Sequence, residues 1–328
     1  MRYTISLLAT SFAALPALAE VPRVVTDFVP AQALVSQVMG DLGQPQMLLT
    51  GGAGAHDFQL RPSQAGMLAD ADLVVWVGPQ MTRWLDKGLE GIGAKAARLT
   101  LLEVPGTYLQ DFQAKGPKAK AGQGGDDHGH DDHGHDDHGH ENTATEAPAA
   151  DGHAHDGLDP HAWLDPGNAP VWLQAIAAEL SRIDPENAAT YAANAAAAAK
   201  GYASLEAELS QAMHPLAGKP FVVAHDAYGY FVSHYGLSVA GAVQLGDATA
   251  SGAETLVGLR AEMEAGGVVC LFPEVAHDPK QAQLLVEGTA VRLGAALDPE
   301  GAMLEPGPEA LTLLLRGLAR DLADCLGA

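Results

Sequence analysis

Histidine is the residue type in this chain whose number and spacing could do chemistry. The sequence holds 14 histidines, and eight of them lie in or just after the repeat GGDDHGHDDHGHDDHGHE, which begins at Gly124. The eight are His128, His130, His133, His135, His138, His140, His153 and His155. Imidazole is a common zinc ligand, and interleaved carboxylates draw cations. We expect either an auxiliary loop that captures, buffers or senses zinc, or a low-complexity insert that binds metal only because histidines do.

Three further histidines stand where ligands usually bind. His225 ends the apolar run PFVVA, His56 lies in the glycine-rich stretch TGGAGAHDFQ after another apolar run, and His161 lies in LDPHAWLDP. Open α/β sheets bind ligands outside the carboxyl ends of their strands. Each histidine taken singly is more often an ordinary polar residue, but together they predict one centre of three imidazoles. Acids that could accept the other ring N–H group flank them, namely Asp57, Asp159, Asp165 and Asp226.

The other three histidines and one acid are weaker candidates for metal ligands. His214 stands at the end of a helical segment and is expected on the surface, whereas His234 and His277 are expected to be structural or solvated. Glu274 follows the apolar run VVCLF and should face the same region as His225. We expect it to be a buried hydrogen-bond partner, the alternative being a metal ligand.

The elements that must position these residues alternate between short apolar runs and amphipathic segments, first over residues 24–92 and again after residue 220. This alternation is typical of α/β folds with parallel strands. It predicts two Rossmann-like lobes, at 20–184 and 215–328. The three strand-end or loop histidines, which come from both halves, are expected to meet at a metal site in the cleft between the lobes. An alanine-rich stretch at 185–214 predicts a rigid linking helix of roughly 43 Å, which argues against large clamshell motion. Residues of about 117–157 lack hydrophobic periodicity and are expected to form a disordered insert in the first lobe.

The first 19 residues have the pattern of a cleaved secretory signal: Arg2, an apolar run and a small-residue end. We expect a protein exported to the periplasm, with no lipid anchor because the signal holds no cysteine. The chain has two cysteines, Cys270 and Cys325. In an oxidising compartment they are expected to form one disulfide, the alternative being two unlinked buried thiols.

Charge excludes some partners. The formal net charge is −23, and the chain remains acidic when the histidine-rich segment is set aside. An acidic surface repels nucleic acid and anionic lipid. We expect no nucleic-acid partner, and a monomer.

Five motifs in order resemble a known family: HDFQLRPSQ, ADLVVWVGPQM, DPHAWLDP, HDAYGYF and VRLGAALDPEG. Together they are similar to the periplasmic zinc-binding proteins of ABC uptake systems, within the cluster A-I metal solute-binding proteins. The resemblance runs from about Val24 to the C-terminus and includes an acidic, histidine-rich insert. It implies two α/β lobes, a rigid helix, a metal site between the lobes, and delivery of the metal to a membrane permease.

Carried onto this chain, the resemblance implies that His56, His161 and His225 are the imidazole ligands and that Asp298, in LDPEG, is the fourth. It also implies a Cys270–Cys325 disulfide. Some relatives carry Glu where this sequence has Ala55, so the alternatives for the fourth ligand are Asp298, water and a histidine of the insert.

Three imidazoles with one oxygen suit Zn²⁺, although Cu²⁺, Ni²⁺ and Co²⁺ are not excluded by this donor set. The manganese and iron importers that the chain resembles place an acid at the position of His225, which favours zinc over manganese. One rival is a zinc hydrolase with three histidines and a water, but the sequence holds no H-E-x-x-H motif, so no enzyme is expected. The other rival is a metal-binding adhesin or storage protein.

Overall fold

The structure is a computed structural model that describes residues 21–50, 54–55, 58–112, 157–244, 253–275 and 277–328. The expected signal at 1–19, the ligand candidate His56 and its neighbour Asp57 lie outside these residues. So do the eight histidines from His128 to His155 and nearly all of the expected insert.

The N-terminal lobe is built on a sheet of parallel strands in the order β2-β1-β3-β4. Its strands are β1 (Val24–Thr26), β2 (Gln46–Met47), β3 (Leu73–Trp76) and β4 (Ala97–Thr100). Its helices are α1 (Val29–Met39), α2 (Pro62–Asp70) and α3 (Arg83–Gly91). The central strands β1 and β3 are buried along their whole length, as apolar strands covered on both faces should be.

The C-terminal lobe repeats this arrangement with the strand order β6-β5-β7-β8, again all parallel. Its strands are β5 (Pro220–His225), β6 (Ser238–Gln244), β7 (Cys270–Phe272) and β8 (Arg292–Leu293). Its helices are α6 (Gly229–Tyr235), α7 (Ala253–Ala265), α8 (Lys280–Val286) and α9 (Ala310–Leu326). The two Rossmann-like lobes expected from the sequence are therefore present.

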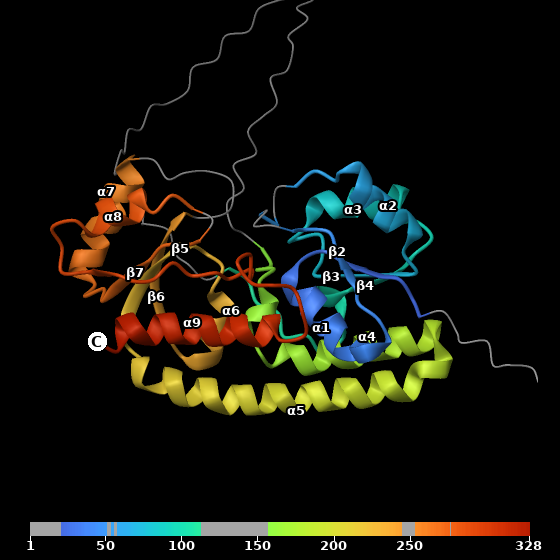
Figure 1. The fold of residues 1–328 in the computed structure, drawn as a ribbon. Coiled ribbons are helices and arrows are strands. Elements are labelled where there is room, and N and C mark those ends of the chain that lie inside the picture. Colours follow the sequence, from blue (N-terminus) through green and yellow to red (C-terminus); the bar gives the residue numbers. More distant parts are fainter. Residues whose placement is uncertain (1–20, 51–53, 56–57, 113–156, 245–252, 276) are drawn as a thin grey trace, which may run out of the picture.

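A long helix, α5 (Ala188–Met213), runs beneath both lobes (Figure 1). At 1.5 Å per residue it spans about 39 Å. It packs against α1, α4 (Asn168–Ile183) and α9. Its buried residues are three, four or seven positions apart, the spacing of one helix face: Tyr191, Ala195, Tyr202, Leu205, Leu209 and Met213. Short 3-10 turns precede and follow it, at Pro185–Asn187 and His214–Leu216.

The two cysteines form a disulfide, as expected. Cys270 of β7 is bonded to Cys325 of α9, with their Cα atoms 6.3 Å apart. The bond ties the central strand β7 to the C-terminal helix.

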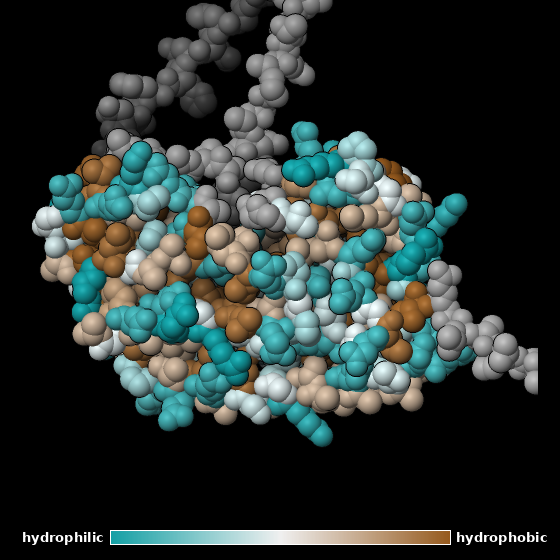
Figure 2. Space-filling model, in the orientation of Figure 1, coloured by the Kyte–Doolittle hydropathy of each residue, from teal (hydrophilic) through white to brown (hydrophobic). Residues whose placement is uncertain are grey.

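The face of the molecule in Figure 2 shows hydrophilic and hydrophobic residues intermixed over both lobes. In the part of the chain that the structure describes, no helix is long and apolar enough to cross a membrane.

Candidate metal centre

His225 is placed by the end of a central strand. In the register of β5 with β7, Val223 lies opposite Phe272, and two residues further on His225 reaches the level of Glu274. There the Nδ1 atom of His225 lies 2.5 Å from Oε2 of Glu274, and both side chains are buried. Neighbouring parallel strands that end at one edge of the sheet therefore bring an imidazole and a carboxylate together. Glu274 is the buried hydrogen-bond partner that the sequence suggested.

His161 is placed by a turn between the lobes. Oδ1 of Asp159 lies 2.7 Å from the Nδ1 atom of His161 and also accepts its backbone N–H group at 3.0 Å. The turn is held by the C-terminal lobe, because the Tyr230 hydroxyl donates to the Asp159 carbonyl at 2.9 Å. The indole of Trp163 likewise donates to the carbonyl of Pro299 at 2.7 Å. Asp159 is thus the flanking acid that holds the His161 ring.

The two rings meet in the interior. Their centroids lie 5.5 Å apart, and His161 and His225 are only 1% and 4% exposed. A carboxylate beside Nδ1 keeps the proton on that atom and places the lone pair of the ring on Nε2. Two imidazoles on one tetrahedral zinc ion, with Zn–N bonds near 2.0 Å, would have centroids about 5.2 Å apart. The observed separation is close to that value.

A third acid, Glu300, lies beside the two rings. Its Oε2 atom accepts the backbone N–H group of Ala55 at 3.4 Å, so it contacts the N-terminal lobe at the residue that precedes His56 in the sequence. Burial raises the pKa of the Glu300 carboxyl to about 7, and the nearby His161 and His225 rings offset part of that rise. The sequence analysis did not single out Glu300, although it follows Asp298 by two residues in LDPEG.

Asp298, the predicted fourth ligand, hydrogen-bonds to backbone groups in the structure. Its Oδ1 atom accepts the backbone N–H group of Ala302 at 2.8 Å, and its Oδ2 atom accepts that of Met303 at 2.9 Å. Both oxygens therefore stabilise the loop that carries Glu300.

Aromatic rings surround the centre. The Trp163 ring lies 5.1 Å from that of His161, and the Tyr228 ring lies 6.3 Å from that of His225, measured between centroids. Burial raises the pKa of the Tyr228 phenol well above its usual range, and the charge of Glu274 adds to the rise. A neutral phenol and an indole thus lie beside the imidazoles, and a surrounding of low polarity strengthens the attraction between a cation and the buried carboxylates.

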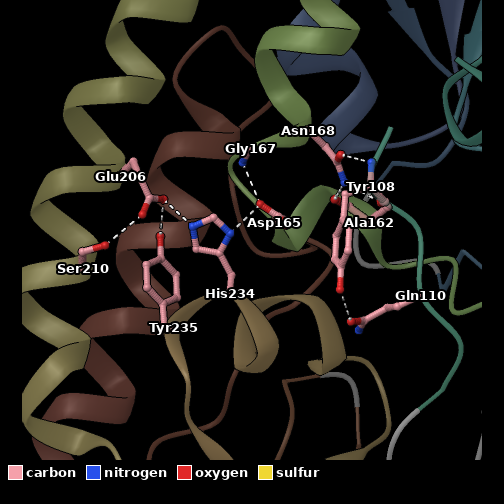
Figure 3. A network of polar contacts seen from close by, with 10 residues as sticks. All are labelled: Tyr108, Gln110, Ala162, Asp165, Gly167, Asn168, Glu206, Ser210, His234 and Tyr235. Carbon is pink, nitrogen blue, oxygen red and sulfur yellow. Dashed lines mark hydrogen bonds and ion pairs between the residues drawn. The ribbon is translucent and has the colours of Figure 1, made fainter. Parts of the chain in front are cut away.

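His234 belongs to a separate polar network, drawn in Figure 3. Its Nδ1 atom lies 2.8 Å from Oδ1 of Asp165, and its Nε2 atom lies 2.8 Å from Oε2 of Glu206 on α5. The hydrogen bond to Asp165 raises the pKa of His234 to about 9, against the opposing effect of burial. His234 is therefore structural, as expected, and Asp165 bonds this ring.

His277 lies nearer the centre than the sequence suggested. Its ring centroid is 6.1 Å from that of His225. His214, in contrast, is exposed at the end of α5. Within the described ranges, no group of three or more His, Cys, Asp or Glu side chains is already arranged to hold a metal ion. The third predicted imidazole, His56, lies outside those ranges.

Comparison with known proteins gives one family. Residues 24–325 match the family described as "Zinc-uptake complex component A periplasmic", ZnuA. The chain is 56% identical to the "High-affinity zinc uptake system protein ZnuA" of Paracoccus denitrificans, over 98% of this chain and 96% of the relative. The protein of the same name from Brucella abortus is 38% identical, over 92% and 91%.

The fold agrees with solved structures of the same family. The crystal structure of a zinc-bound ZnuA deletion mutant superimposes with a TM-score of 0.71, covering 94% of this chain and 99% of that one at 20% identity. At that identity the likeness shows the fold alone. The match over almost the whole sequence and the identity to curated relatives show that the chain belongs to the ZnuA family of zinc-uptake components.

Proposed function

We propose that this chain captures Zn²⁺ with high affinity in the periplasm and delivers it to the membrane permease of a zinc ABC transporter. The observation that carries the proposal is the pair of buried rings, His161 and His225, whose centroids are 5.5 Å apart. Each ring has its Nδ1 atom beside a buried carboxylate, that of Asp159 or Glu274. His56, which follows Ala55 in the sequence, supplies the third imidazole in this proposal.

The pairing of rings with carboxylates supports zinc in particular. A carboxylate on the far nitrogen makes an imidazole more basic and fixes its direction, which favours a tight zinc bond. Nitrogen donors in a four-coordinate site suit zinc better than manganese, which prefers oxygen ligands. The ion is cargo here, and the site performs no reaction on it.

Glu300 is the better-placed oxygen donor for the fourth position. It lies within electrostatic reach of both rings and bonds Ala55, whereas the oxygens of Asp298 accept backbone N–H groups. A carboxyl with a pKa of about 7 releases its proton readily when a divalent cation arrives beside it. In this proposal Glu300 binds the ion and Asp298 holds the loop in shape.

The histidine-rich insert has an auxiliary role in the proposal. Its eight histidines and the aspartates among them form an anionic tract that would raise the concentration of zinc available to the protein. Such ligands bind zinc weakly and exchange it quickly, so they pass the ion to the high-affinity site at His161 and His225, called the tight site below, without replacing it.

The experiment is a zinc titration against a competing chelator, with metal stoichiometry recorded. His161→Ala and His225→Ala should each weaken the tight site at least about 100-fold. Glu300→Gln and Asp298→Asn form a matched pair, and the first should weaken binding about tenfold while the second stays within about threefold of the unsubstituted protein. The reverse order would assign the ligand to Asp298. Unchanged affinity in both histidine variants would overturn the proposed site.

Transport itself needs a cellular test. The gene for this chain, supplied to a bacterium that lacks its own zinc-binding component, should restore growth in zinc-poor medium. The His225→Ala variant should not restore it. An adhesin or storage protein would give no rescue with either form.

A further inference from the structure

The turn after β7 brings a second imidazole back towards His225. The backbone N–H group of His277 bonds the carbonyl of Glu274 at 3.2 Å, which closes the turn. The N–H group of Val275 bonds the carbonyl of Leu297 at 3.0 Å, which fixes the turn against the next segment. Glu274 and His277 therefore reach the same ring from one short turn.

The His277 ring has an unsatisfied buried atom. Its Nδ1 atom is buried and has no hydrogen-bond partner among the residues that the structure describes. A buried polar atom without a partner costs stability and is rare in folded proteins. The residue as a whole is only half-buried, so part of it reaches solvent. An imidazole held in this position could coordinate a passing metal ion.

The spacing distinguishes His277 from a resident ligand. Its centroid is 6.1 Å from that of His225, whereas the centroids of His161 and His225 are 5.5 Å apart. Two imidazoles on a tetrahedral zinc ion need about 5.2 Å, so the His225–His277 pair is too far apart for that geometry. A small rotation of the half-buried ring would shorten the distance. His225 is the neighbour that both other rings share.

We propose that His277 is a transfer ligand, which binds zinc briefly as the ion enters or leaves the tight site. This inference rests on the proposed function, since it assumes that His161 and His225 hold the ion at rest. On release, the ion pivots on His225: a zinc–nitrogen bond to His277 forms as the bond to His161 breaks, and the number of ligands is conserved. Neutral imidazole donates its lone pair, and no electron transfer is involved. The ion thus moves from a residue that is 1% exposed to one that is partly exposed.

The test measures exchange rates separately from affinity. The full chain is loaded with half an equivalent of zinc, so that the tight site fills first, and is mixed rapidly with an excess of a chromophoric chelator. His277→Ala and His277→Gln should slow zinc release roughly tenfold, which corresponds to about 1.4 kcal/mol in barrier height. The dissociation constant should stay within about threefold, so zinc entry must slow by a similar factor. His214→Ala, at an exposed histidine, is the control and should leave both rates unchanged.

A second readout uses Co²⁺ in place of zinc. The visible absorption of the bound cobalt reports its ligands, so it should be unchanged in both His277 variants and altered in His225→Ala. Unchanged zinc release in both His277 variants would overturn the inference. So would an affinity loss of about tenfold or an altered cobalt spectrum, because His277 would then be a resident ligand. Failure of the proposed function looks different: His161→Ala and His225→Ala would bind zinc as tightly as the unsubstituted protein.

Discussion

Replacing Glu274 by Gln removes one charge from the centre and almost no volume. The amide oxygen of Gln can still accept a hydrogen bond from Nδ1 of His225, where the carboxylate now lies at 2.5 Å. The variant therefore tests the charge of the pair and leaves the direction of the ring unchanged. Both side chains are about 5% exposed, so solvent screens the pair little.

The size of the effect follows from the kind of hydrogen bond. A bond to a charged partner contributes about 1.5 to 3 kcal/mol, and a neutral one about 0.5 to 1.5 kcal/mol. Once zinc draws electron density from Nε2, the charged bond strengthens more than the neutral one. The loss should be about 1 to 2 kcal/mol, which weakens zinc binding roughly 5- to 30-fold.

The assay is competition for zinc against a chelator of known affinity, at pH 7 and fixed ionic strength. Asp159→Asn is the matched variant at the other ring, where the carboxylate lies 2.7 Å from Nδ1 of His161, and it should weaken binding by a similar factor. Circular dichroism checks that both variants fold. Zinc affinity within about twofold of the unsubstituted protein in Glu274→Gln would refute the reasoning that the carboxylate strengthens the ligand.

Three further predictions concern the disulfide, the His234 network and the histidine-rich insert. Replacing both Cys270 and Cys325 by Ala should lower the free energy of unfolding by about 4 kcal/mol, measured by urea denaturation, because the bond closes a loop across 55 positions of sequence. His234→Gln should destabilise the protein by roughly 2 to 3 kcal/mol near pH 6, with the difference disappearing as the pH rises through about 9, because a raised histidine pKa stabilises the fold only while the ring is protonated. Deleting residues 124–155 should lower the number of zinc ions bound, measured by metal analysis, and leave the tight site intact.

Each of these has a contradicting outcome. Equal urea midpoints for oxidised and cysteine-free protein would show that the disulfide adds nothing to the fold. A His234→Gln difference that persists above pH 10 would point to packing rather than charge. Loss of the tight site on deletion of the insert would mean that an insert histidine is one of its ligands.

The parts of the site that lie on strands could be predicted from the sequence. The end of an apolar run is also the end of a strand, and parallel strands end at one edge of a sheet, so His225 and Glu274 were expected in the same region. The structure confirms their contact. The pairing of Cys270 with Cys325 was also predictable, because the chain has no other cysteines.

The parts that lie in turns could not be predicted in the same way. Glu300 stands two residues after Asp298, and no pattern in LDPEG says which carboxylate turns inward. The backbone path decides it, since the loop needs acceptors for the N–H groups of Ala302 and Met303 and Asp298 supplies them. His277, which also lies in a turn, was expected to be structural or solvated. Its approach to His225 depends on a turn closed by one backbone hydrogen bond to Glu274.

The anchoring of the His161 turn has a consequence for lobe motion. Although His161 precedes α4 and α5 in the chain, Tyr230 and Pro299 of the C-terminal lobe hold its turn. A hinge movement that swings the N-terminal sheet outward would leave both described rings on the same rigid body. The empty protein would then keep His161, His225 and the proposed ligand Glu300 together as a preformed set of donors, and an ion could be seated before the N-terminal sheet returns.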